Sequence, residues 1–396
     1  MKKAILLIID GLGDLPTPKT PLQAAKKPNF DKLAKGGACG LLAPVGRYVV
    51  PGSDVAHLSI LGYDPHKYYN GRGPLEALGL GIKLQEGDVA FRANFATLEG
   101  DEITDRRAGR IDTETASKLA SELSAKLNNG VEAIFRNSNE HRGVLVLRGQ
   151  NLSEHVSATD PHGDMKLHQC QPLSEDAVKT AKAVDEFTQF AHRTLEMAPE
   201  NEGREKPANI VLVRGAGKYW KVPSFFERFG LSGACVAGGA LYKGVSRYIG
   251  LDVLDVVGAT GDKNTNLNAK GKAVLSALID HDFVFVHVKG CDSAGHDGDF
   301  GTKKKMLERI DKELLPWLIK SGAYIIITGD HSTPCSRKAH SGHEVPILVY
   351  GDSERVDSVK KFDEISVQSG GLGHMEGKDI VPLILNLIEK SEKYGS

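Results

Sequence analysis

Three strongly apolar segments, far apart in this chain, each end at an acidic residue or a histidine. KKAILLIIDG stops at Asp10, and FVFVHVKGCDSAGH leads to Asp292 and His296. YIIITGDH stops at Asp330 and His331. Runs of Ile, Val and Leu bounded by Gly are typical of strands buried on both faces, as in a parallel sheet covered by helices. Open α/β sheets bind ligands where their strands end, so the pattern predicts one edge at which carboxylates and imidazoles hold two metal ions.

Strand-like and helix-like patterns alternate along most of the chain. Strands are predicted at 3–10 and near 210–214, 252–257, 283–288, 323–328 and 346–350, with a helix over 29–35. This alternation predicts an α/β fold with a doubly wound, mostly parallel sheet.

Between about residues 83 and 172 the pattern changes to hairpin-like strands around one amphipathic helix over 113–127. A helix over 175–195 follows, and NIVLVRGAG then resembles a return to the main sheet. We therefore expect a core of 1–82 and 173–396, with an inserted smaller α+β domain of 83–172.

Composition excludes several classes of partner. Lysine and arginine number 50 against 51 acidic residues, so no broad positive field exists to bind nucleic acid or an anionic membrane. No apolar stretch reaches the roughly 20 residues that span a bilayer. Five scattered cysteines without a CxxC spacing fit a reducing compartment better than disulfides or a thiolate metal site. The sequence thus predicts a cytoplasmic protein with a small-molecule substrate.

Ser53 is a candidate nucleophile. It follows Pro51-Gly52, where a tight turn opens a helix, so its hydroxyl would lie at a positive helix N-terminus. Serine at such a turn is more often a helix cap, and no Ser-His-Asp triad is present nearby. The two predicted metal ions support the hypothesis that Ser53 is a nucleophile, because a metal lowers the pKa of a hydroxyl and can replace the missing base.

The candidate metal ligands also allow two interpretations, a structural role or metal binding. A lone Asp after a strand is often a helix cap, and a lone Asp-His pair is often a surface turn. Here Asp292-x-x-x-His296 and Asp330-His331 both follow buried strands, and His340 precedes another strand, VPILVY. Oxygen and imidazole ligands without thiolate favour manganese, magnesium, cobalt or zinc.

A series of motifs resembles one family along essentially the whole chain. In order they are IIDGLGD, GSDVAHLSILGYDP, GRGPLEALG, FRANFATL with ITDRRAGRI, EHRGVLVLRG, DPH, VRGAG, GATGDKNTN, DSAGHD, TGDHSTPC, HSGHEVPILV and SGGLGHMEGKDIVP. The chain resembles the archaeal type of cofactor-independent phosphoglycerate mutase, within the alkaline phosphatase superfamily. The resemblance implies an alkaline-phosphatase-like core with an inserted domain, and catalysis without 2,3-bisphosphoglycerate.

Carried over to this chain, the resemblance makes Ser53 the residue that becomes phosphorylated. It implies one metal ion on Asp10, Asp330 and His331 with Ser53, and a second ion on Asp292, His296 and His340. His340 is preferred to His343 because the family's ligand lies five residues before the valine of Val345-Pro346. His343 and His374 depart from the family pattern, and their roles stay open.

The same resemblance implies that 3-phosphoglycerate transfers its phosphoryl group to serine and receives it back on the other hydroxyl of the trapped glycerate. The inserted domain is then a lid that excludes water. Candidate groups for the substrate's carboxylate and phosphate are Arg106, Arg107, Arg110, Arg142, Asp160, His162, Lys243 and Arg247. Taken alone, such arginines are usually solvated surface charges, and Asp160 is as readily a turn cap. Lys243 and Arg247 also fit a pair on a helix surface.

Two other functions fit part of the pattern. Another metal-dependent phosphomonoesterase or phosphomutase of the superfamily would share Ser53 and the ligands and differ in the inserted domain. A metal-binding scaffold without catalysis fits less well, since every expected ligand position holds a competent residue. The native metal and a possible homo-oligomer are not indicated by the sequence.

Overall fold

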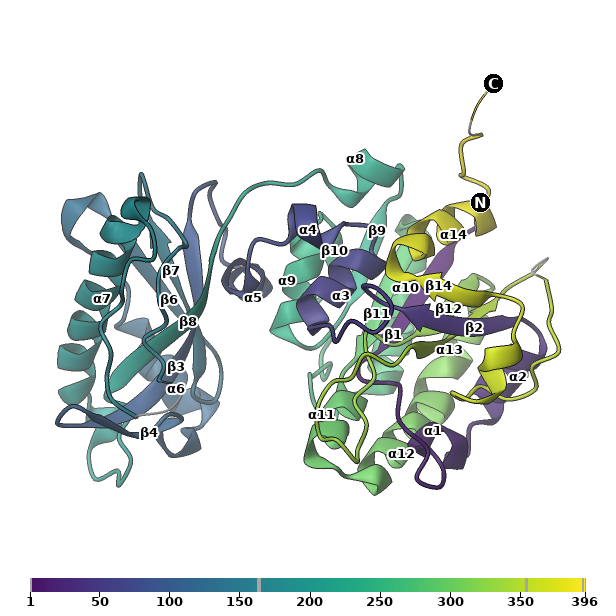
Figure 1. Ribbon diagram of the computed structural model, residues 1–396, viewed down its shortest axis with the longest axis horizontal. Coiled ribbons are helices and arrows are strands. Elements are labelled where there is room, and N and C mark those ends of the chain that lie inside the picture. Colours follow the sequence, from purple (N-terminus) through teal and green to yellow (C-terminus); the bar gives the residue numbers. More distant parts are fainter. Residues whose placement is uncertain (1, 162–164, 353–354, 394, 396) are drawn as a thin grey trace. The chain divides into compact units, whose positions relative to one another are not determined.

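The computed structural model describes residues 2–161, 165–352, 355–393 and 395, and it divides the chain into two compact units. Unit 1 comprises Met1–Tyr69 and Val222–Ser396, and unit 2 comprises Asn70–Lys221. Each unit has its own sheet (Figure 1). Among the described residues, no helix combines the length and the apolar character needed to cross a bilayer.

Unit 1 is built on an eight-stranded sheet in the order β10-β9-β11-β1-β12-β13-β2-β14. Its strands are β1 (Ala4–Ile9), β2 (Ala38–Ala43), β9 (Gly233–Val236), β10 (Asp252–Val253), β11 (Phe283–Val288), β12 (Tyr324–Thr328), β13 (Val345–Tyr350) and β14 (Gly373–Glu376). Only the pairs made by β13, with β12 and β2, are antiparallel. The sheet is therefore mostly parallel, as predicted, and β10 is shorter than the strand expected at 252–257.

Helices cover both faces of this sheet. They are α1 (Pro21–Ala24), α2 (Pro28–Lys35), α3 (Ser53–Ile60), α4 (Pro65–Tyr68), α8 (Phe225–Phe229), α9 (Ala240–Tyr248), α10 (Leu267–Asp280), α11 (Gly290–Asp297), α12 (Phe300–Arg309), α13 (Leu315–Lys320) and α14 (Ile380–Leu387). His57 of α3 and Tyr242 of α9 contact His287 on one face of β11. Val284 and Val286, on the opposite face, join the core formed with α2, α10 and α13. The sheet is thus doubly wound.

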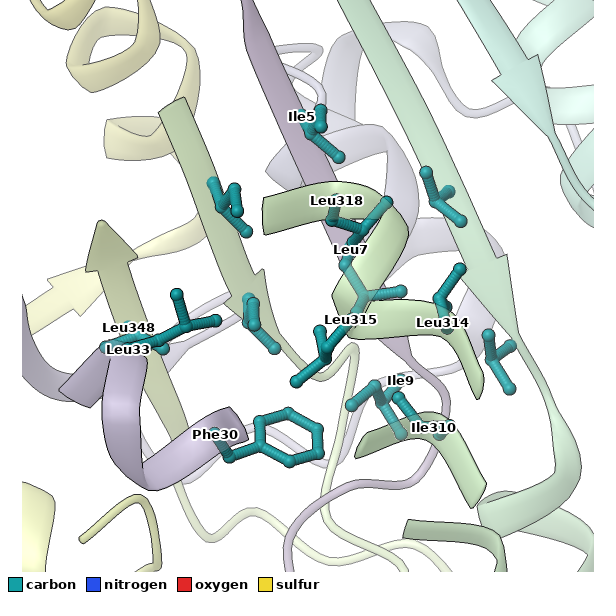
Figure 2. Packing of buried hydrophobic residues seen from close by; sticks show 14 of the residues in the cluster. Ile5, Leu7, Ile9, Phe30, Leu33, Ile310, Leu314, Leu315, Leu318 and Leu348 are labelled. Atoms are coloured by element: carbon teal, nitrogen blue, oxygen red, sulfur yellow. The ribbon is translucent and has the colours of Figure 1, made fainter. Parts of the chain in front are cut away.

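The central strand β1 shows why these runs are apolar throughout. Ile5, Leu7 and Ile9 belong to the same core cluster as residues of α2 and α13, and Figure 2 shows Leu7 beside Leu315 and Leu318. The alternate residues of β1 face the other side and are equally buried. A strand covered on both faces needs no polar alternation, which explains the continuous apolar pattern.

Unit 2 carries an antiparallel sheet in the order β4-β3-β7-β6-β5, with β8 paired to β3. Its elements are α5 (Arg72–Gly79), β3 (Val89–Glu99), β4 (Glu102–Asp105), η1 (Ala108–Arg110), α6 (Thr113–Ser121), β5 (Ala125–Lys126), β6 (Glu132–Asn139), β7 (Arg142–Arg148), α7 (Val178–Glu196) and β8 (Ile210–Lys218). The helix expected over 113–127 ends at Ser121, and β5 follows it.

The predicted domain boundaries are corrected by α7 and β8. Both were assigned to the core, but β8 pairs with β3 from Val89↔Lys218 to Ala96↔Ile210. Phe187 of α7 packs in the same apolar cluster as Phe135 of β6. The apolar run at 210–214 predicts a strand correctly, yet it belongs to the sheet of unit 2, so this unit extends well beyond 83–172.

A buried carboxyl group in unit 1 gives a testable pH dependence. Glu364 accepts hydrogen bonds from the Asp14 amide (3.1 Å) and the Thr20 hydroxyl (2.6 Å). Burial raises its pKa from 4.5 to about 7. The folded state therefore keeps a proton that the unfolded chain releases between pH 4.5 and 7, so this group's contribution to stability falls as pH rises through that window.

We expect Glu364→Gln to remove this pH dependence. The amide stays neutral, its oxygen can accept from Asp14, and its nitrogen can donate to Thr20. The free energy of unfolding of the variant, relative to the natural chain, should rise by about 3 kcal/mol between pH 4.5 and 8. Denaturant unfolding of both proteins at the two pH values measures it. An identical difference at both pH values would contradict the assignment.

Candidate active site

The three strands singled out by sequence lie side by side and end together. β1 is the neighbour of both β11 and β12, with Ile9 opposite Val288 and Ile8 opposite Thr328. Asp10 follows the last residue of β1 directly, while Asp292 lies in the first turn of α11 and Asp330 two residues after β12. The predicted convergence of the three carboxylates on one edge is confirmed.

Among the residues that the structure describes, two groups of side chains have ligand atoms close enough to bind a metal ion. The outer group is Asp292, His296 and His340, and the inner group is Asp10, Asp292 and His331. Within each group the ligand atoms all lie within 4.8 Å of one another. Asp292 belongs to both groups, whereas the resemblance assigned it to the outer ion alone.

The three histidines are held in the tautomer that a metal requires. His296 Nδ1 donates to the Lys338 carbonyl (3.0 Å), and His340 Nδ1 donates to the Pro51 carbonyl (2.8 Å). His331 Nδ1 lies 2.9 Å from the Thr333 hydroxyl, which itself donates to Asp292 Oδ1. Because each Nδ1 carries the proton, each Nε2 is left with a lone pair for a ligand.

Two buried carboxylate oxygens beside His331, one from Asp10 of the inner group and one from Asp330 outside it, lack a hydrogen-bond donor. Asp10 Oδ1 and Asp330 Oδ2 are both fully enclosed and unpaired, and each lies near His331 Nε2, at 3.4 and 3.2 Å. Asp330 Oδ1 accepts from the Gly11 amide (3.1 Å). Buried unpaired carboxylate oxygens are costly unless a cation meets them, so the donor set fits a metal ion.

Gly11 is required by the close packing of this loop. Its φ is +67°, and a Cβ here would lie 2.7 Å from the Cα of Asp292. Any larger residue would push apart the two segments that carry Asp10 and Asp292. The glycine of the IIDG motif therefore sets the spacing of the inner group.

Ser53 begins α3, as predicted, and the helix has no side-chain cap. Its Oγ lies 3.2 Å from His331 Nε2, so the hydroxyl points to the inner group. The side chain of His57, one turn later, returns to the start of the helix, where its Nδ1 donates to the Ser53 carbonyl (2.6 Å). The cap reading is excluded, because Ser53 is inside the first turn and its hydroxyl faces the carboxylate cluster.

A second layer of residues holds the inner carboxylates. Lys289 Nζ lies 3.2 Å from Asp10 Oδ2 and 2.7 Å from Asp292 Oδ2. The Tyr242 hydroxyl donates to Asp10 Oδ2, and the Tyr242 ring stacks on His287. Burial opposes ionisation of Asp10, but Lys289 and the histidines outweigh it and hold the pKa of Asp10 well below its usual range. Burial lowers the pKa of His287 to about 4, so this imidazole is neutral.

Other histidines and cysteines near the site have structural contacts. His343 Nδ1 lies 3.0 Å from the Ser341 hydroxyl, and His374 pairs with Glu344 at 2.8 Å. His340 is thus the histidine brought to the outer group. Cys291 is buried, and burial raises the pKa of its thiol to about 12, as expected for a packing residue and not for a nucleophile.

Most of the predicted substrate-binding residues lie in unit 2. Arg106 pairs with the buried Asp160 at 2.7 Å, and Arg214 approaches the other oxygen of Asp160 at 3.3 Å. Arg107, Arg110 and Arg142 are exposed, and no described residue provides an ion-pair partner for them. His162 lies outside the described residues. The predicted arginines thus divide into one held by a carboxylate and three that extend into solvent.

The loop that carries Arg107 and Arg110 is strained. Ala108, Gly109 and Arg110 have consecutive φ values of +45°, +65° and +56°. Non-glycine residues rarely adopt this conformation, and such strain is concentrated at ligand-binding sites.

Burial lowers the pKa of Arg92, on β3, to about 10 despite its pairing with Glu76.

In unit 1, Lys243 and Arg247 lie one turn apart on α9. Lys243 Nζ is 3.3 Å from Asp255. Their helix begins beside the site, because Tyr242 of the same turn reaches Asp10.

Sequence reasoning missed several residues that the structure brings to these sites. In unit 1 they are Tyr242, Lys289, His287 and His57, and in unit 2 they are Arg92 and Arg214. A signal existed for His287, the one polar side chain in the buried run FVFVHV, and for Lys289, which stands between that strand and Asp292. No local signal distinguished Tyr242 from other helix residues.

Comparisons with known proteins agree on one family. A family model described as 2,3-bisphosphoglycerate-independent phosphoglycerate mutase matches residues 34–201. Two relatives of that name are each 46% identical to this chain over its whole length. One is from Methanocaldococcus jannaschii, with 99% of that protein covered, and the other is from Pyrococcus abyssi, with 100% covered.

Two solved structures are similar over nearly the full length of both chains. A protein from Pyrococcus horikoshii has a TM-score of 0.87 at 38% identity, with 100% of this chain and 99% of that one covered. A cofactor-independent phosphoglycerate mutase from Thermoplasma acidophilum has a TM-score of 0.73 at 36% identity, with 98% and 100% covered.

Proposed function

The chain belongs to the family of 2,3-bisphosphoglycerate-independent phosphoglycerate mutases, and we propose that it interconverts 3-phosphoglycerate and 2-phosphoglycerate through a phosphorylated Ser53. The observation that carries this proposal is the place of Ser53. Its hydroxyl lies at the uncapped start of α3 and 3.2 Å from His331, beside two groups of metal-binding residues.

We assign one divalent ion to Asp292, His296 and His340, and a second to Asp10, Asp330 and His331 with Ser53. Asp292 also lies close enough to Asp10 and His331 to contribute to the second ion. The support is the unpaired Asp10 and Asp330 oxygens and the three imidazoles with a free Nε2. When bound, such ions stabilise negative charge on phosphoryl oxygens and lower the pKa of a hydroxyl. The donor set admits Mn²⁺, Mg²⁺, Co²⁺ or Zn²⁺.

In the first half-reaction Ser53 Oγ forms a bond to phosphorus while the bond from phosphorus to the C3 oxygen of the substrate breaks. The proton of Ser53 leaves as the glycerate oxygen gains one. In the second half-reaction the C2 hydroxyl of the same glycerate attacks phosphoserine and restores Ser53. The positive end of α3 favours the anion at Ser53 in both halves, because Gly52 at the N-cap provides no side-chain cap.

The substrate carries a carboxylate and a phosphate, both of which suit the fork of an arginine. We propose that Arg106, Arg107, Arg110 and Arg142 of unit 2, together with Arg92 and Arg214, bind these groups. Asp160 would hold Arg106 and Arg214 in place, since it contacts both. Lys243 and Arg247 are the corresponding candidates in unit 1, and His162 stays a candidate for moving a proton.

Glycerate must stay bound between the half-reactions, because water at phosphoserine would release phosphate instead. We propose that unit 2 acts as the lid that excludes water. Its separate sheet and core support this role, since a unit with its own core can move as one body.

The test is to incubate the metal-loaded protein with 3-phosphoglycerate and without bisphosphoglycerate, and to follow 2-phosphoglycerate and free phosphate together. We expect 2-phosphoglycerate with little free phosphate. Phosphate alone would identify a phosphomonoesterase that shares the site but does not retain glycerate. If neither product forms, the substrate assignment is wrong.

A further inference from the structure

Lys289 is a lysine that joins the two proposed metal groups. It lies between the end of β11 and the first turn of α11, and its side chain is 30% exposed. Its Nζ lies 2.7 Å from Asp292 Oδ2, 3.2 Å from Asp10 Oδ2 and 3.2 Å from the Tyr242 hydroxyl. One ammonium group therefore contacts a carboxylate from each strand end.

The contacts divide the two oxygens of each carboxylate between different partners. Oδ2 of Asp10 faces Lys289, Tyr242 and, at 3.4 Å, Nε2 of His287. Oδ1 of Asp10 is unpaired and lies 3.4 Å from His331. Oδ2 of Asp292 faces Lys289, while Oδ1 lies 3.3 and 3.5 Å from Nε2 of His296 and His340. Lys289 thus lies on the sides of the two carboxylates that are turned away from the candidate ligand histidines His331, His296 and His340.

The balance of charge makes this lysine important whenever no metal is bound. Asp10, Asp292 and Asp330 are all buried, with 0%, 5% and 0% of their surface exposed. Among the described residues, Lys289 is the one lysine or arginine that pairs with any of the three. Buried carboxylates that lose their cation strongly destabilise a fold.

We propose that Lys289 is a counter-cation that stabilises the metal-free site. Its positive charge also lowers the affinity of the site for a divalent ion. A positive charge held against the Oδ2 atoms repels a divalent ion that approaches Oδ1 of the same carboxylates. Lys289 thereby makes the metal-free protein more stable and the metal-bound state less favoured than it would be with a neutral residue. This inference rests on the proposed metal site but not on the proposed substrate.

The test measures two quantities for Lys289→Met in the full chain: thermal unfolding in chelator, and the affinity for Mn²⁺ alone by calorimetry. We expect the melting temperature of the metal-free variant to fall by roughly 3 °C or more, because the carboxylates lose their cation. We expect its first Mn²⁺ to bind about tenfold more tightly, because the repulsive charge is gone.

Two variants serve as controls. Lys289→Arg keeps the charge and should stay near the natural protein in both measurements. Tyr242→Phe removes a donor to Asp10 Oδ2 without removing a positive charge, so it should not tighten Mn²⁺ binding. If Lys289→Met does not fold, Lys289→Gln replaces it and must show the same two directions, since it also lacks the charge.

An unchanged melting temperature, or weaker Mn²⁺ binding in the neutral variant, would overturn the proposal and make Lys289 a positioning residue. Tighter binding by Tyr242→Phe would also overturn it, since loss of a contact and not of charge would then be the cause. Absence of Mn²⁺ binding by the natural protein would refute both the metal site and the proposal that Lys289 weakens metal binding. It would do so independently of any assay with phosphoglycerate.

Discussion

Ser53→Ala is expected to lower the rate of phosphoglycerate interconversion by about 10⁴-fold or more. The variant has no oxygen to receive the phosphoryl group, and loss of a covalent nucleophile removes the reaction path and not merely a contact. Acid-quenched samples of the natural protein, incubated with 3-phosphoglycerate, should carry a phosphoryl group on the peptide that contains Ser53. The variant should carry none. Stopped assays of 2-phosphoglycerate and mass spectrometry of the peptide provide the two readouts.

Ser59→Ala is a matched control for this prediction. Ser59 is on the same helix, is similarly buried, and loses the same hydroxyl, but it lies more than a turn further from the site. It should retain most of the activity and the phosphopeptide. A similar loss in both variants would point to damage to α3 instead of loss of a nucleophile. Full activity of Ser53→Ala would remove Ser53 from the mechanism.

The part of the site that sequence predicted best is the part set by strand ends. Asp10, Asp292 and Asp330 follow apolar runs directly or within a few residues, and the runs had to be buried parallel strands. The carboxyl ends of adjacent parallel strands lie at one edge of a sheet. The proximity of the three carboxylates could therefore be predicted from the apolar runs together with this rule. The shared role of Asp292 did not follow, because it depends on distances between atoms of separate loops.

Assignment of strands to sheets could not be made from local pattern. The run at 210–214 has the same apolar character as β1, yet its partner is β3, more than a hundred residues earlier. Apolar residues indicate burial but not the neighbour that buries them. For the same reason the contact of Tyr242 with Asp10 could not be predicted, because the two residues are 232 positions apart in the sequence.

The second large effect is expected at Asp292, because this carboxylate belongs to both metal groups. Asp292→Ala should impair binding of both ions, so that Mn²⁺ bound per chain falls toward zero and the mutase rate falls by about 10³-fold or more. His296→Ala removes a partly exposed ligand of the outer group alone. It should lower the Mn²⁺ content by one ion and leave the inner group able to bind.

Metal analysis after gel filtration distinguishes these outcomes, with unfolding in chelator to monitor the fold. The metal-free Asp292→Ala protein should unfold no earlier than the natural one. Removal of Asp292 relieves its repulsion of Asp10, and Lys289 remains beside Asp10 as a counter-charge. An intact Asp292→Ala protein with unchanged metal content would contradict the ligand assignment. Loss of one ion in both variants would place Asp292 in the outer group only, as the resemblance first implied.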